Sequence, residues 1–219
     1  MYVIGASWMR YLPHSLISTL RLNSQIEKKV RNMKTFIVAL IALVVIAGSI
    51  WVYVWTGSYN ISAASPHWSI TLEMLETVRD RSIVAHSKGI STPPLAAETE
   101  RAEKGLHHYH PMCRLCHGAP GYEREEFAMG LYPGAPDLAS GQIQQEWNDA
   151  ELYWIVKNGL KMTGMPSFGV THDDEDIWGL VAFVRRLAGV QPAQYRALVE
   201  KTGLEKETER SHEKEADHH

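Results

Sequence analysis

Residues 36–55 hold twenty consecutive positions without a charged side chain. As an α-helix, such a segment is about 30 Å long, which matches the hydrocarbon core of a bilayer. Lipid offers the backbone no hydrogen-bond partners, so a single spanning segment has to be helical. The sequence therefore predicts one transmembrane helix, over residues 36–56.

A cleaved signal peptide is the alternative interpretation of this stretch. The apolar region of a signal peptide is typically about 7–15 residues long and ends near small residues, which Ser62-Ala63-Ala64 supply. Trp51, Tyr53 and Trp55, however, lie at the distal end of the segment, and such aromatic residues are typical of a membrane interface. We therefore expect a retained anchor in contact with membrane lipid.

Charge sets the expected orientation of this anchor. Residues 1–35 form a basic arm that contains six basic residues and one acid, Glu27. Because positively charged flanks stay in the cytoplasm, we expect a single-pass protein of the inner membrane whose N-terminus is cytoplasmic and whose remainder is periplasmic. Met33, just before the span, is an alternative start. The six basic residues are Arg10, Arg21, Lys28, Lys29, Arg31 and Lys34.

The part after Trp55 is acidic. It holds 16 of the 22 basic and 24 of the 25 acidic residues of the chain. It therefore lacks the basic stripe with which proteins bind nucleic acid, and we expect no nucleic-acid partner.

The only two cysteines of the chain lie in Cys113-Arg114-Leu115-Cys116-His117. Cys-x-x-Cys-His is the attachment sequence of a c-type haem, in which both thiols add to vinyl groups and the histidine ligates the iron. A structural zinc site would need further ligands, and a thioredoxin-like dithiol would need flanking strands that the pattern lacks. We therefore predict one covalent haem c on Cys113 and Cys116, with His117 as an axial ligand.

The residues around this motif resemble a class I cytochrome c. Gly105, Tyr109 and Cys113 recur every four residues, on one helical face that runs into the attachment turn. Residues 174–187 resemble the C-terminal helix of that family. The resemblance implies an all-α haem domain in which this helix crosses the first one, with Gly105 and Tyr109 meeting Phe183.

The resemblance covers residues 97–190 and implies a sixth iron ligand. Met165-Pro166 is similar to the family loop that supplies an axial methionine, and Met162 is its nearest rival. A His/Met iron has a raised potential suited to electron transfer, whereas a missing ligand would leave a position for small molecules. The other candidates are Met112, Met129, His107, His108, His110 and His172, with His67 and His86 further away in the sequence.

The family also implies that a proline carbonyl accepts the N–H of the ligating histidine, as metal-bound imidazoles usually require. Pro133 and Pro136 both qualify. Trp154 is a candidate for the wall of the haem pocket, although an aromatic residue in a helix is more often part of the core.

Residues 57–96 are expected to form a periplasmic tether that ends near Pro93-Pro94. Leu72, Leu75 and Val78 have helical spacing and predict an amphipathic helix over 69–88. Its apolar face either packs on the haem domain or membrane surface, or docks an integral-membrane partner.

The C-terminal extension, residues 191–219, is rich in charged residues and poor in apolar ones from Leu204 onward. We expect it to be largely disordered. Its histidines could capture a metal weakly.

Taken with the resemblance, these features predict a membrane-anchored monohaem electron carrier rather than an enzyme. The implied partners are a quinol-oxidising complex as donor and a terminal oxidase or other respiratory enzyme as acceptor. The first alternative is a permanent haem c subunit of a larger membrane oxidoreductase. The second is a haem sensor or enzyme with an open iron site.

Overall fold

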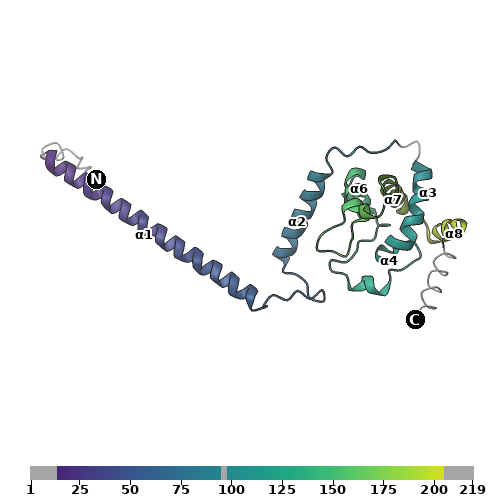
Figure 1. Cartoon of the computed structure of the whole chain (residues 1–219), viewed down its shortest axis with the longest axis horizontal. Helices are drawn as coiled ribbons and strands as arrows, with labels where there is room; N and C mark the ends of the chain where they lie inside the picture. The colour runs from purple at the N-terminus through teal and green to yellow at the C-terminus, as the bar shows by residue number, and fades with distance from the viewer. Residues whose placement is uncertain (1–13, 95–97, 205–219) are drawn as a thin grey trace, which may run out of the picture. The chain divides into compact units, whose positions relative to one another are not determined.

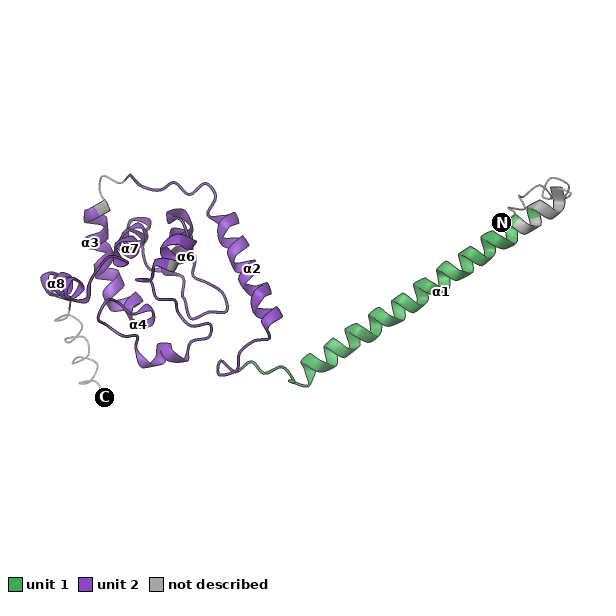
Figure 2. Ribbon diagram, turned by 180° about the vertical axis from the view of Figure 1, so that it is seen from behind, with its two compact units in different colours: residues 1–61 green, residues 62–219 purple. Residues whose placement is uncertain are grey.

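The computed structural model describes residues 14–94 and 98–204. Within these ranges every regular element is helical, and the one β contact is an isolated bridge between Ala119 and Tyr122. The chain divides into two compact units, residues 1–61 and 62–219 (Figure 2). The all-α fold predicted from the sequence is confirmed.

The first unit consists of one long helix, α1 (His14–Trp55) (Figure 1). Residues 21–55 are long and apolar enough to cross a membrane. Their apolar side chains, such as Phe36 and Val54, are exposed, which suits lipid contact better than contact with water. The rings of Trp51 and Trp55 stack with centroids 5.8 Å apart at the end of this helix. Length and composition therefore fit the predicted anchor.

Two crossing helices form the core of the second unit, α3 (Glu98–His108) and α7 (Asp174–Leu187). A Cβ built on Gly105 would overlap the backbone carbonyl of Gly179, so the two helices meet without side chains between them. Beside this crossing, the rings of Tyr109 and Phe183 lie 5.1 Å apart. The expected contact of Gly105 and Tyr109 with Phe183 is confirmed.

The chain leaves α3 through a π-helical turn, η3 (Tyr109–Cys113), and continues as a short helix, α4 (Arg114–His117). Pro111 lies inside the π turn. Because proline has no amide hydrogen, the regular α-helical ladder cannot pass through it, and π turns are often found at functional sites. The wider turn therefore separates α3 from the segment that carries the cysteine pair.

Helix α2 (Ser69–His86) packs one of its faces on α6 (Asp149–Asn158) (Figure 1). Ile83 is buried there, and the ring of His86 lies 5.6 Å from that of Trp154. Of the two uses considered for this helix, packing on its own domain is observed for this face.

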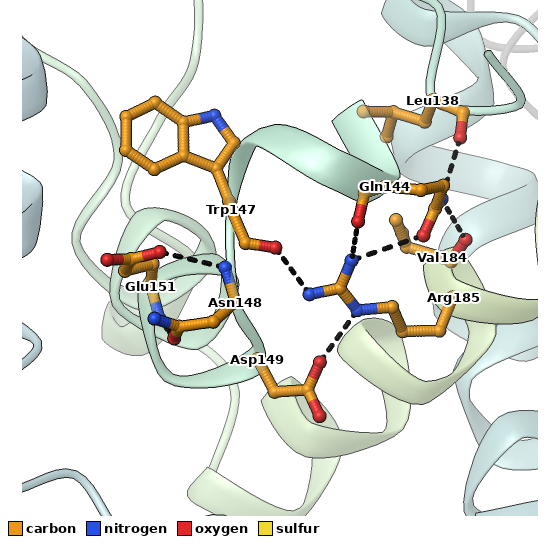
Figure 3. Close-up of polar contacts among 8 residues, drawn as sticks. All are labelled: Leu138, Gln144, Trp147, Asn148, Asp149, Glu151, Val184 and Arg185. Atoms are coloured by element: carbon orange, nitrogen blue, oxygen red, sulfur yellow. Dashed lines mark hydrogen bonds and ion pairs between the residues drawn. The ribbon is translucent and has the colours of Figure 1, made fainter. Parts of the chain in front are cut away.

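Arg185 of α7 joins the segment that precedes α6 to the core (Figure 3). Its guanidinium donates to the carbonyl oxygens of Gln144 (2.9 Å) and Trp147 (2.5 Å) and to the Asp149 carboxylate (2.6 Å). The Gln144 amide in turn donates to the carbonyl of Leu138 at 3.2 Å. This network fixes α5 (Gly141–Glu146), the start of α6 and the end of the preceding loop.

Two short 3-10 helices, η4 (Glu126–Gly130) and η5 (Phe168–Val170), lie in the long loops. The last described element, α8 (Pro192–Thr202), was not anticipated, because the extension 191–219 was expected to be largely disordered. Tyr195 and Val199 are buried in the core from one face of this helix, since they lie four residues apart, and Leu204 is buried just after the C-cap Gly203. Residues 205–219, which include the histidines at the end of the chain, lie outside the described residues.

Candidate haem site

The cysteine pair lies on a turn that is tied to the helix before it. Cys113 is the last residue of η3, and Cys116 belongs to α4. Both thiols are free and partly buried. The buried Tyr109 hydroxyl donates to the carbonyl oxygen of Gly118 at 2.8 Å. Gly118 itself has φ +71°, a left-handed conformation that favours glycine. The turn therefore has a fixed geometry directly after His117.

His117 is held by a backbone carbonyl. Its Nδ1 lies 2.8 Å from the carbonyl oxygen of Pro136. A carbonyl can only accept, so Nδ1 carries the hydrogen and Nε2 keeps the lone pair with which a histidine binds a metal. Burial lowers the pKa of His117, although the bond to Pro136 partly offsets this, and the neutral imidazole is favoured. Of the two prolines left open by the sequence, the structure brings Pro136 to His117.

The two thiols suit addition to a haem better than dithiol exchange. Burial raises the pKa of the Cys113 thiol to about 12 and also raises that of Cys116. A redox dithiol depends on a lowered thiol pKa, which this turn does not provide. Among residues 14–94 and 98–204, no group of three or more His, Cys, Asp or Glu side chains is placed to hold a metal ion. The donor set of the turn fits a haem.

Met165 lies in a loop that is closed by its own hydrogen bonds. The Thr163 hydroxyl donates to the Leu160 carbonyl at 2.7 Å and accepts from the Met165 amide at 3.1 Å. The Met165 carbonyl accepts from the Leu160 amide at 3.2 Å. A Cβ on Gly164 would lie 2.6 Å from the Leu131 side chain, so this loop packs on the one that leads to Pro136. Met165 itself is half-buried.

Met162, the alternative candidate for the axial ligand, is exposed where Met165 is half-buried. Met162 is 73% exposed and adopts φ +60°, which points to a residue at the tip of a turn rather than one turned into a pocket. Met129 is likewise exposed, and Met112 is half-buried beside Cys113. Among these four residues, Met165 combines partial burial with a fixed backbone.

Several of the histidines contact other residues. His108 Nε2 lies 3.3 Å from a carboxylate oxygen of Asp176, and its ring meets that of His172. His110 is buried, with Nδ1 3.1 Å from the Tyr195 hydroxyl. His107, by contrast, is exposed.

The tether histidines contact the domain through aromatic residues. The backbone amide of His67 donates to the Tyr132 hydroxyl at 2.9 Å, and the two rings lie 5.2 Å apart. Trp154, a predicted wall of the haem pocket, is partly buried, and its ring faces His86.

Sequence reasoning missed the contacts that the tether and α8 make. The His67–Tyr132 and His110–Tyr195 pairs join residues that lie 65 and 85 positions apart. No local periodicity reports such pairs. An available signal was the apolar spacing of Tyr195, Leu198 and Val199, which is typical of a packed helix.

The comparison with known families agrees with this geometry. Residues 100–184 match the family model described as "Cytochrome C oxidase, cbb3-type, subunit III". The match begins in α3 and ends in α7, so it contains the attachment turn, Pro136 and Met165, while α2 and α8 lie outside it. No curated protein matches the chain. The matched family binds haem c, and its cytochrome domain fits an electron-carrier role. Residues 100–184 therefore form a class I c-type cytochrome domain that binds haem c, and the chain also carries an apolar N-terminal helix suited to a membrane anchor.

Proposed function

We propose that this protein is a periplasm-facing, membrane-anchored cytochrome that passes single electrons between respiratory redox partners through one covalent His/Met haem. The observation that carries the proposal is the hydrogen bond between His117 and Pro136, which presents a neutral imidazole nitrogen one residue after Cys116. A quinol-oxidising complex would supply the electrons, and a terminal oxidase or another respiratory enzyme would accept them.

The residues of the attachment turn have separate roles in this proposal. The Cys113 and Cys116 thiols would hold the haem by addition across its vinyl groups, in which sulfur bonds to one carbon and the thiol hydrogen to the other. His117 Nε2 would ligate the iron, and Pro136 holds the imidazole ring through Nδ1. When bound, haem c supplies an iron that changes between the ferrous and ferric states without making or breaking bonds.

Met165 would supply the second iron ligand. Its backbone is fixed by Thr163 and Leu160, so the thioether is held by a loop that needs little reorganisation. A soft thioether opposite a histidine favours the ferrous state and raises the potential. With His117 and Met165 both bound to the iron, no position would remain for a small molecule, which is the difference from an open-site sensor or enzyme.

Haem staining and optical spectra test this function. Full-length protein expressed with the haem-attachment machinery should give a haem-stained band on a denaturing gel, and Cys113→Ser with Cys116→Ser should abolish the band. The ferric wild type should show the weak long-wavelength band of methionine sulfur ligation. Met165→Ala should lose this band, and Met162→Ala, the matched control, should keep it. Loss in the Met162 variant alone would assign the ligand to Met162.

A second function has one observation in its favour. The matched family is described as a subunit of an oxidase, so we also consider a permanent haem c subunit of a larger membrane enzyme. Gentle solubilisation separates the two. A carrier should run in detergent as a small particle of this chain, whereas a subunit should stay in a stable assembly with other proteins and retain its haem there.

A further inference from the structure

The first half of the attachment turn is buried on two sides. Tyr109 and His110 are consecutive residues of η3, and they are only 0% and 3% exposed. Consecutive side chains of a helical turn point in different directions, so two buried neighbours require a packing element on each side. Tyr109 meets Phe183 of α7. His110 meets Tyr195 of α8, a helix that lies outside the residues matched by the family model.

The contact between His110 and Tyr195 is both polar and closely packed. His110 Nδ1 lies 3.1 Å from the Tyr195 hydroxyl oxygen, and the centroids of the two rings are 5.8 Å apart. Tyr195 is fully buried, and this burial raises the pKa of its phenol, so the hydroxyl stays neutral and shares a hydrogen with the imidazole. Removing either polar atom would take a hydrogen bond from a buried group of the other residue, which is costly in a protein interior.

Helix α8 also contacts the chain beyond the attachment motif. The ring of Tyr122 lies 5.4 Å from that of Tyr195 and 5.4 Å from that of His110. A Cβ on Gly121 would lie 3.0 Å from the Cβ of Pro192, the first residue of α8. The motif is therefore bracketed, because α8 packs on a residue shortly before it and on two residues shortly after it.

Arg114, inside the motif, is held by two of the same residues. Its Nε donates to the carbonyl oxygen of His110 at 3.3 Å, and its guanidinium carbon lies 5.5 Å from the centre of the Tyr122 ring. The same guanidinium donates to the Glu125 carboxylate at 3.2 Å. The cysteine end of the turn is thus connected to α8 through side chains that contact Tyr195 directly.

Both ends of the turn have to be fixed for the haem to be held in one orientation. The hydrogen bond between His117 and the Pro136 carbonyl holds one end, but a single anchor would let the turn rotate about it. We propose that Tyr195 is a positioning residue for the haem, which through His110 fixes the cysteine end of the turn. The Cys113 sulfur then keeps the orientation that the bound haem requires, as outer residues do for metal ligands. This rests on the proposed function, which supplies the attached haem.

Proton NMR of the ferric, haem-loaded full chain in detergent tests this role, because the shifted haem methyl signals report how the haem is oriented against its ligands. Tyr195→Phe keeps the ring and removes only the hydroxyl, and it should shift these signals. His110→Leu should shift them in the same way. His110→Asn retains a polar atom close to the position of Nδ1, so its signals should return toward those of the wild type. Should Tyr195→Phe fail to accumulate, the two His110 variants still carry the comparison.

Val199→Ala is the matched control for a merely structural effect. Val199 lies one turn after Tyr195 on the same helix and is fully buried. Its truncation weakens the packing of α8 without removing the hydrogen bond to His110. The haem methyl signals of this variant should stay at their wild-type positions although the protein unfolds more easily.

Three results would overturn the proposal. They are wild-type signals in Tyr195→Phe, signals of His110→Asn that match those of His110→Leu, and a shift in Val199→Ala as large as that in Tyr195→Phe. Haem staining of the same proteins on a denaturing gel reports separately on the proposed function. A wild type without a stained band would refute the attached haem itself, whereas loss of positioning leaves the covalent haem and its band in place.

Discussion

Gly105 and Gly179 bring the backbones of α3 and α7 into direct contact. A Cβ on Gly179 would lie 3.5 Å from the Cα of Gly105, and a Cβ on Gly105 would overlap the Gly179 carbonyl group. Both neighbours are helix backbone, so neither can move aside as a flexible side chain would. The crossing determines where α3 ends, and hence where the attachment turn begins.

Gly105→Ala should therefore destabilise the domain. Helix propensity favours alanine over glycine by about 1 kcal/mol, but forcing the two backbones apart costs about 1–3 kcal/mol and occasionally more. We expect a net loss in the free energy of unfolding, measured by chemical denaturation of the haem-loaded full chain in detergent. Gly141→Ala is the control, because nothing lies within 4 Å of the added Cβ. Equal stability of the two variants would contradict this account of the crossing.

Tyr109→Phe tests the bond that holds the turn after His117. The Tyr109 side chain is fully buried, and its hydroxyl donates to the Gly118 carbonyl at 2.8 Å. Burial raises the pKa of Tyr109, so the phenol keeps its proton and remains a donor at neutral pH. Removing the hydroxyl leaves a buried acceptor without its partner, which costs about 1–3 kcal/mol.

The matched control for that substitution is Tyr153→Phe. In the wild type, the Tyr153 hydroxyl accepts from the exposed ammonium group of Lys157 at 3.0 Å. A comparable loss for both variants, measured by the same denaturation, would show that the bond to Gly118 has no special role.

Much of the fold was predictable because its signals are local. The spacing of Gly105, Tyr109 and Cys113 marks one helical face, and Asp173 before residues 174–187 caps the last core helix by accepting from the Asp176 amide. Cys-x-x-Cys-His likewise carries its chemistry in five consecutive residues.

The assignments that the sequence left open depend on contacts between segments that are distant in the chain. The choice between Pro133 and Pro136 required the path of a loop of nineteen residues from His117, and neither proline has a local pattern that decides it. The position of Trp154 against His86 depends in the same way on α2 packing on α6.

The pair Lys157–Asp174 should make stability depend on pH. Asp174 begins α7, and the hydrogen bond from Lys157 lowers the pKa of its carboxyl. The carboxylate therefore adds stability above its unfolded pKa of about 4, and this is lost as the pH falls through the lower, folded value. In Lys157→Met the pKa of Asp174 should rise, as followed by carbon NMR of the carboxyl. Lys104→Met, which removes the neighbouring pair with Glu175, should leave the titration of Asp174 nearly unchanged.

Arg185→Lys should show how much the guanidinium network contributes. The wild-type side chain satisfies two backbone carbonyls and the Asp149 carboxylate at once, because its planar fork presents several donors in fixed directions. An ammonium group keeps the charge but cannot reach all three acceptors, so one partly buried carbonyl loses its partner. Hydrogen bonds to charged groups contribute about 1.5–3 kcal/mol each, so we expect a loss near the upper part of that range.

The adjacent Arg186 provides the control for that substitution, because its side chain is exposed and Arg186→Lys should change the free energy of unfolding by less than about 0.5 kcal/mol. Since Gln144 also holds the Leu138 carbonyl, two residues beyond Pro136, the Arg185 variant should in addition disturb the loop that orients His117. A shifted His117 ring signal in the proton NMR spectrum of the ferric protein would report this. A stable Arg185→Lys protein with an unchanged His117 signal would show instead that the network neither stabilises the domain nor orients the His117 loop.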